Sequence, residues 1–196
     1  MIPLILASTS IYRGELLQKT GIPFTAKKPV FDEDSAKAEL VKIGKSPLEL
    51  AEALSQGKAH SFDSSGKTII AGDQLVNFNG LVLGKSGSFE KAFAQLKSMN
   101  GKTHELITAV TILSDNKKFH LNHFTLLTMK NLSDFEIENY LKKDQPYDCA
   151  GSYKIEKSGL ILFDDVKTDD FSAIQGLPMI WISKKLKELG YEFFTH

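Results

Sequence analysis

Three short segments of this chain carry residues that could bind phosphate or accept a proton. The first is Ser8-Thr9-Ser10, which follows the apolar run Pro3 to Ala7 and precedes a helical pattern that contains Arg13. A strand that enters a helix through such a turn presents unpaired N–H groups at the positive end of the helix. Serine hydroxyls add donors, and an arginine can bind phosphate through two N–H groups. The segment therefore suits phosphate, although simple N-capping beside a surface arginine explains the same residues.

The second segment, Gly72-Asp73-Gln74, lies between two apolar runs, 68–71 and 75–78, that read as strands. A carboxylate in a glycine-flanked turn can approach a ligand closely. Together with the acidic pair Asp32 and Glu33, Asp73 could build a carboxylate group for Mg²⁺, which prefers a few carboxylates combined with phosphate oxygens. An aspartate that only stabilises its own turn is the alternative.

The third segment, Gly84-Lys85-Ser86, looks like the end of a P-loop. The glycine that this motif needs five residues earlier is absent, because position 79 is Asn, and the residues from 81 to 83 are strand-like. We therefore exclude a P-loop, while Lys85 can still bind phosphate from a turn. Lys58 lies in a helix that the capping box Ser46-Pro47-Leu48-Glu49 predicts, where a lysine is ordinarily solvated.

Charge and cysteine content exclude several classes of function. The 24 Lys and Arg residues equal the 24 Asp and Glu residues, so the 196-residue chain lacks the net positive charge that suits duplex nucleic acid or an anionic membrane. Cys149 is the only cysteine, which excludes an intramolecular disulfide and a CxxC site. The start MIPLILASTS has no basic segment and becomes polar too soon for a signal peptide or a membrane span. We therefore expect a cytoplasmic protein.

The pattern of elements predicts an α/β fold. Strands are expected at 3–7, 68–71, 75–78, 81–83, 103–113 and 118–130, and helices after Ser10, after Ser46, from Ser88 to Met99, after Ser133 and from near Pro178. Residues 24–45 read as irregular. Asn79-Gly80 is a strong hairpin signal. Because hairpins interrupt the alternation of strands and helices, the sheet is expected to be mixed.

Fragments along nearly the whole chain together resemble the Maf family of nucleotide pyrophosphatases. In order they are LILASTSIYRGELL (4–17), FDED (31–34), QGKA (56–59), AGDQLV (71–76), LGKSGS (83–88), GKTHELITAV (101–110), DCAGSYKIE (148–156) and IQGLPM (174–179). The resemblance implies one domain over residues 1–196, with the two-lobed fold of Maf proteins and inosine triphosphatases. That fold has a strongly twisted mixed β-sheet and a central cleft. The resemblance further implies hydrolysis of a nucleoside triphosphate between its α- and β-phosphates with a divalent cation, Mg²⁺ or Mn²⁺.

The resemblance also implies roles for individual residues. Asp73 aligns with the general base of the family, with Gln74 beside it, and Glu33 would help Asp73 to hold the metal. The residues implied to clamp the triphosphate are Ser8, Ser10, Arg13, Lys58 and Lys85. The chain departs from the usual family pattern at Ile11 and Ser86, where proline is common, and at Gly57, where glutamate is common.

At two positions the chain resembles the branch of the family that contains 7-methyl-GTP pyrophosphatases. Tyr12 stands where the pyrimidine-preferring branch tends to carry arginine, and Glu156 stands where that branch has glutamine. N7-methylation makes guanine a cation, which an aromatic face attracts by about 0.5–2 kcal/mol. A glutamate can accept hydrogen bonds from the donor edge of guanine. We therefore expect Tyr12, Gln74 and Glu156 to set the base specificity.

Other functions stay open at this point. A dTTP or UTP pyrophosphatase would use the same phosphate groups with a different base pocket. A non-catalytic nucleotide-binding regulator of cell division would make Asp73 dispensable. The clustering of Ser, Arg, Lys and Asp at loop positions argues against a purely structural module. The expected partner is the nucleoside triphosphate, without duplex nucleic acid or membrane, and a homodimer is compatible with the sequence.

Overall fold

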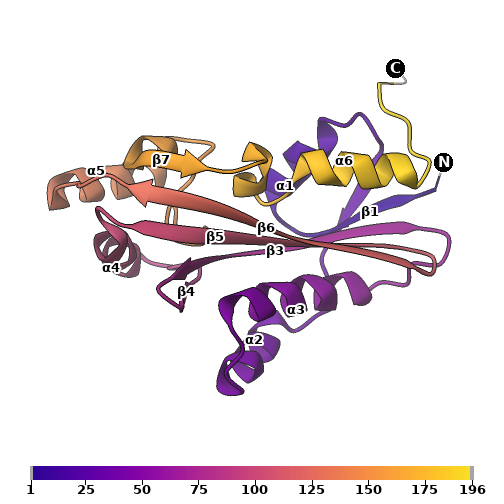
Figure 1. Ribbon diagram of the computed structural model, residues 1–196, viewed down its shortest axis with the longest axis horizontal. Coiled ribbons are helices and arrows are strands. Elements are labelled where there is room, and N and C mark those ends of the chain that lie inside the picture. Colours follow the sequence, from indigo (N-terminus) through magenta and orange to yellow (C-terminus); the bar gives the residue numbers. More distant parts are fainter. Residues whose placement is uncertain (1, 195–196) are drawn as a thin grey trace. The chain divides into compact units, whose positions relative to one another are not determined.

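The computed structural model describes residues 2–194 and contains a seven-stranded sheet within them (Figure 1). The strands are β1 (Leu4–Ala7), β2 (Phe24–Lys27), β3 (Thr68–Phe78), β4 (Leu81–Leu83), β5 (Thr103–Ser114), β6 (Lys117–Met129) and β7 (Phe163–Lys167). Their order is β2-β1-β3-β5-β6-β7, and β4 pairs with β3. Strand β1 runs parallel to β2 and β3, whereas β4 and β7 pair antiparallel with their neighbours. The predicted α/β class with a mixed sheet is confirmed.

Helices connect these strands. They are α1 (Ile11–Gln18), α2 (Glu33–Lys42), α3 (Pro47–His60), α4 (Phe89–Met99), α5 (Asp134–Asp144) and α6 (Met179–Glu188), with short 3₁₀ helices at Gly159–Leu162 and Phe171–Gln175. The predicted capping boxes are present at Ser46 with Glu49 and at Ser133 with Glu136. Between residues 2 and 194 no helix is both long and apolar enough to cross a membrane.

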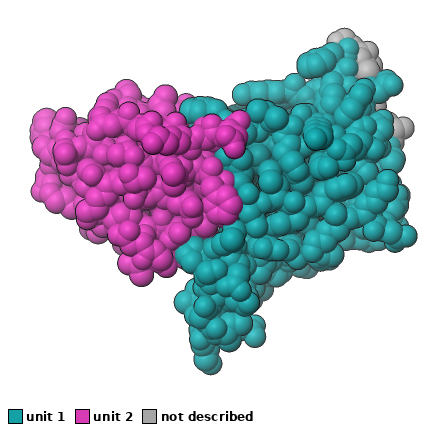
Figure 2. Space-filling model, in the orientation of Figure 1, with its two compact units in different colours: residues 1–73, 108–123, 170–196 teal, residues 74–107, 124–169 magenta. Residues whose placement is uncertain are grey.

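The chain divides into two compact units (Figure 2). The first unit contains residues 1–73, 108–123 and 170–196, and the second contains residues 74–107 and 124–169. Strands β3, β5 and β6 each contribute residues to both units. Two compact units agree with the two-lobed architecture that the family resemblance implies.

In the first unit, helices cover both faces of the sheet around β1. Leu4 and Leu6 belong to a buried cluster with Leu17 of α1 and Leu186 of α6. Ile5 points the other way and belongs to a second cluster, which includes Ala59 of α3 and Ile69 of β3. Figure 1 shows α1 and α6 on one side of the sheet and α3 on the other. Burial on both faces explains why β1 is an uninterrupted apolar run in the sequence.

In the second unit, an aromatic cluster anchors the segment that precedes Glu156. The rings of Tyr153 and Phe163 meet edge to face with centroids 5.0 Å apart. The Tyr153 hydroxyl lies 3.1 Å from Nε2 of His104, which belongs to β5. Burial lowers the pKa of His104 to about 4, so this imidazole is neutral at pH 7.

Two sequence predictions are wrong. Residues 24–45 are not irregular, because they contain β2 and α2. Helix α2 has no buried residue, so it lacks the apolar periodicity by which helices are recognised in a sequence. Gly72-Asp73-Gln74 is not a turn either, since β3 continues through it from Thr68 to Phe78.

Candidate active site

The turn between β1 and α1 is built by serine hydroxyls. The Ser10 side chain caps α1 by accepting a hydrogen bond from the Arg13 backbone N–H at 3.4 Å. The Ser8 hydroxyl is buried and accepts hydrogen bonds from the Ser10 backbone N–H at 3.1 Å and from Arg13 Nη1 at 3.5 Å. N-capping thus accounts for Ser10, whereas Ser8 also contacts the arginine side chain.

Arg13 is not a freely exposed surface residue. Its Nε donates a hydrogen bond to the Gly176 carbonyl at 3.1 Å. A Cβ added at Gly176, whose φ is +106°, would lie 2.9 Å from Arg13 Nε, and one at Gly72 would lie 3.4 Å from it. Two glycines therefore make room for the guanidinium. Surrounding protein lowers the Arg13 pKa, and the carboxylates of Asp73 and Glu33 oppose this effect.

Lys58 joins two carboxylates from different elements. Its Nζ donates a hydrogen bond to Asp73 Oδ1 at 2.7 Å and lies 2.8 Å from Glu33 Oε2. The side chains of Lys58 and Asp73 are only 10% and 7% exposed, whereas that of Glu33 is 47% exposed. Lys58 is therefore a buried ion-paired residue, and the ordinary expectation of a solvated lysine is wrong here.

Burial controls the protonation of Asp73. Desolvation raises the pKa of this carboxyl group from its usual value, and Glu33 raises it further. The ion pair and hydrogen bond with Lys58 and the charge of Arg13 act in the opposite direction. A carboxylate with a raised pKa is a better proton acceptor than an ordinary surface aspartate.

The first unit thus brings together Ser8, Ser10, Arg13, Glu33, Lys58 and Asp73. Tyr12 is half-buried on α1 in the same unit. Lys85, Gln74 and Glu156 belong to the second unit. Lys85 is exposed and forms an isolated bridge with Ala150, Gln74 is half-buried in β3, and Glu156 is exposed. Their participation in one site with the first group stays a prediction.

The loop that carries Glu156 is held from both sides. The Lys154 backbone N–H donates to the Tyr140 hydroxyl at 2.8 Å, and the Ser158 N–H donates to Asp144 Oδ2 at 2.8 Å. The Gly159 N–H also donates to the Lys154 carbonyl at 2.8 Å. Sequence reasoning missed Tyr140 and Asp144, and it missed that Gly72 and Gly176 adjoin Arg13, because no local pattern in the sequence reports these contacts.

Glu33 and Asp73 are the two carboxylates of this group that could bind a divalent cation together with substrate oxygens. Glu33 and Asp73 both approach Lys58 Nζ, so two carboxylates from different elements converge on one point. Among the residues that the structure describes, no three His, Cys, Asp or Glu side chains gather in a group able to hold a metal. Mg²⁺ ordinarily combines one or two carboxylates with phosphate oxygens and water, so a two-carboxylate site suits it.

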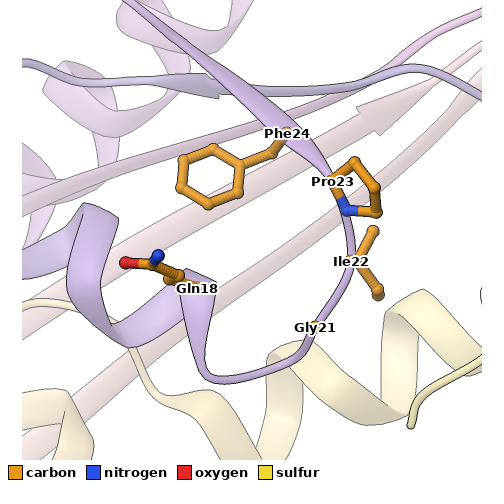
Figure 3. Close-up of a pocket in the computed structure, with 5 residues that line it drawn as sticks. All are labelled: Gln18, Gly21, Ile22, Pro23 and Phe24. Atoms are coloured by element: carbon orange, nitrogen blue, oxygen red, sulfur yellow. The ribbon is translucent and has the colours of Figure 1, made fainter. Parts of the chain in front are cut away.

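A separate surface depression lies between the end of α1 and the start of β2 (Figure 3). It is lined by Gln18, Gly21, Ile22, Pro23 and Phe24. None of these side chains is charged, so this depression lacks the groups that a triphosphate requires.

A family model described as Maf-like protein matches residues 3–189 of the chain. The chain belongs to this family, as its sequence motifs predict. It is 46% identical over 184 residues to a 7-methyl-GTP pyrophosphatase of Bdellovibrio bacteriovorus. The aligned residues cover 94% of this chain and 95% of that protein. It is also 40% identical over 195 residues to a 7-methyl-GTP pyrophosphatase of a Polaromonas species, with 98% and 87% of the two chains covered.

Proposed function

We propose that the protein hydrolyses a nucleoside triphosphate, with 7-methyl-GTP as the preferred substrate, to the monophosphate and pyrophosphate. The observation that carries this proposal is the buried Asp73 carboxylate held by Lys58 beside Arg13 and Glu33. The group combines a proton acceptor with cations that suit phosphate oxygens. The substrate named for the Bdellovibrio and Polaromonas relatives supports the choice of base.

Binding of the triphosphate relies on positive charge and hydroxyl donors. Arg13 can offer its Nη groups to phosphate while its Nε stays on the Gly176 carbonyl. Ser8 and Ser10 lie at the positive end of α1, where backbone N–H groups also favour an anion. Lys58 contributes a second cation, which is buried, and Lys85 supplies a third cation from the second unit.

Asp73 accepts a proton from the attacking water. The water oxygen forms a bond to the α-phosphorus, and the bond between that phosphorus and the oxygen bridging to the β-phosphorus breaks. Pyrophosphate leaves with the electrons of the broken bond, and the water proton passes to Asp73. Lys58 keeps the carboxylate oriented before the transfer through its 2.7 Å hydrogen bond. Catalysis of this kind depends on positioning and electrostatic stabilisation.

Glu33 and Asp73 would hold the divalent cation, Mg²⁺ or Mn²⁺, together with phosphate oxygens. When bound, the cation would neutralise charge on the triphosphate. The single positive charge of Lys58 lies 2.7 Å from Asp73 Oδ1 and 2.8 Å from Glu33 Oε2, so it offsets only part of the charge of the two carboxylates.

We propose that Tyr12, Gln74 and Glu156 recognise the base and that residues 1–196 act as one functional domain. The firm anchoring of the Glu156 loop by Tyr140 and Asp144 supports a role that needs a fixed carboxylate. In a cell, the reaction would remove modified nucleotides from the cytoplasm before they enter nucleic acid.

The decisive experiment is a panel of nucleotides assayed for release of pyrophosphate. We expect the highest kcat/KM for 7-methyl-GTP among 7-methyl-GTP, GTP, dTTP and UTP, and loss of activity when a chelator removes Mg²⁺ and Mn²⁺. Asp73→Asn keeps the shape of the side chain and should lower turnover by about 100-fold or more, the scale for a positioned general base. Preference for dTTP or UTP would favour the pyrimidine alternative, and nucleotide binding without turnover would favour a regulatory protein.

A further inference from the structure

Glu33 reaches Lys58 from a helix that is weakly anchored. Helix α2 has no buried residue, and Asp32 caps it by accepting from the Ser35 N–H at 3.1 Å. Both residues of this cap lie at the surface. The Glu33 carboxylate nevertheless lies 2.8 Å from the buried Lys58 ammonium. A specific contact is needed to hold the start of α2 at this place, because exposed helices open easily.

That contact is made by Phe31 and Gly57. A Cβ added at Gly57 would lie 2.5 Å from both Cε2 and Cζ of Phe31 and 3.1 Å from Cδ2. The Phe31 ring therefore occupies the space that any other side chain at position 57 would fill. Phe31 precedes Glu33 by two residues, and Gly57 immediately precedes Lys58 in α3. The packing contact is thus adjacent to both partners of the ion pair.

Helix geometry does not require glycine at position 57. Gly57 is absent from the glycines with positive φ and lies inside α3. A glycine in a helix interior destabilises the helix by roughly 1 kcal/mol relative to alanine. The close approach of the Phe31 ring explains why a residue unfavourable to the helix stands here.

We propose that Phe31 and Gly57 are positioning residues that place Glu33 beside Lys58 and Asp73 through the contact of the ring with the bare helix backbone. The inference rests on the proposed function, because it assumes that the position of Glu33 affects the proposed reaction. It adds two uncharged residues to the set that determines activity, neither of which is expected to touch the substrate.

The test first adds a methyl group at position 57 and then removes the Phe31 ring atoms that this group would contact most closely. Gly57→Ala should speed amide hydrogen exchange in residues 33–42 by about tenfold, because the ring must move and α2 loosens. It should lower kcat/KM by roughly 10- to 100-fold, the scale for a small misplacement of an active-site group. Thermal stability should stay equal or rise, since alanine favours the helix.

Two further variants make the test specific. Phe31→Leu combined with Gly57→Ala removes Cε2 and Cζ, and it should recover kcat/KM to within about threefold of Phe31→Leu alone, as expected for residues in direct contact. Gly14→Ala is the matched control, because Gly14 is also helical and nothing lies within 4 Å of its added Cβ. This control should leave both exchange and turnover unchanged.

The outcomes separate the inference from the proposed function. The inference is overturned if amide hydrogen exchange in α2 is the same in Gly57→Ala as in the wild type. It is also overturned if exchange in α2 becomes faster while kcat/KM stays normal. A double variant whose kcat/KM stays well below that of Phe31→Leu alone also overturns it, because the methyl group would then act without Phe31. A wild-type protein that releases no pyrophosphate from any nucleotide overturns the proposed function itself.

Discussion

Single residues at this site combine burial with opposite charges at short range. Lys58 is ion-paired with the buried carboxylate of Asp73 and with the partly exposed carboxylate of Glu33. Its positive charge is therefore compensated before any ligand binds. Removing one partner of such a buried group is costly, since the remaining charge is left uncompensated. Conservative substitutions are therefore the most informative. Truncating one of these side chains can unfold the protein, and the loss of activity then says nothing about catalysis.

Arg13→Lys is the informative change at the arginine. Lysine keeps the positive charge but has no planar fork, so it cannot bond the Gly176 carbonyl and a phosphate at the same time, as we propose for Arg13. We expect kcat/KM to fall by about 10- to 100-fold, the equivalent of one lost hydrogen bond to a charged group. Steady-state kinetics of pyrophosphate release give the value.

Lys19→Arg, at an exposed position after α1, is the control and should change nothing. If Arg13→Lys also retains normal kcat/KM, Arg13 acts through its charge alone and the bidentate role is excluded.

The residue types of the site could be recognised in the sequence, but their environments could not. Asp73 and Arg13 stand in motifs with a chemical meaning. The burial of Lys58 depends on β3 and α2, which lie beside α3 only in the folded chain. Gly176 is 163 positions from Arg13, and no local pattern connects them. Contacts of this range are invisible to periodicity and propensity.

At the scale of elements, the predictions succeeded where a local signal defines a boundary. The helices with strong caps at Ser46, Ser88 and Ser133 begin where the sequence places them. The strands β2 and β7 and the exposed helix α2 are not predicted by the sequence, and none of them has a strong apolar pattern. The glycine beside Asp73 predicts a turn, whereas in the structure Gly72 gives room to Arg13 within a continuous strand.

Ser46→Ala tests the start of α3. The Ser46 hydroxyl accepts from the Glu49 N–H at 3.3 Å, and the variant loses this cap. We expect the free energy of unfolding to fall by about 1 kcal/mol, with kcat/KM unchanged, because Ser46 is at the opposite end of α3 from Lys58. Chemical denaturation and the pyrophosphate assay measure the two quantities.

Ser183→Ala is the matched control, since the Ser183 hydroxyl donates a hydrogen bond to the Ile180 carbonyl within its own helix and caps no helix end. Its stability should change by no more than about 0.5 kcal/mol. A large loss of activity in Ser46→Ala without loss of stability would contradict a purely structural cap.

At the scale of the whole molecule, we propose that base specificity depends on Tyr12 of the first unit and on Gln74 and Glu156 of the second. Glu156→Gln replaces one acceptor oxygen of Glu156 by a donor and removes its charge. We expect kcat/KM for 7-methyl-GTP to fall by about 10- to 100-fold, the scale of a hydrogen bond to a charged group, and the gap to UTP and dTTP to narrow. The four nucleotides are compared on the same preparations.

Glu138→Gln on α5 is the control, because Glu138 is ion-paired at the surface with Lys142 and lies outside the proposed pocket. If the ratios of kcat/KM among the four nucleotides are the same in Glu156→Gln as in the wild type, Glu156 does not determine base specificity. The proposed pyrophosphatase activity would still stand.

The interleaved course of the chain has a consequence for fragments of the protein. The first unit uses three separate stretches and the second uses two, and β3, β5 and β6 pass from one unit into the other. No single cut in the polypeptide can release either unit complete. Strand β1 pairs with β3, which is synthesised more than 60 residues later, so its place between β2 and β3 cannot form before then. Late synthesis of partner strands makes such folds slow to complete, so truncated translation products would expose unpaired strand edges and aggregate.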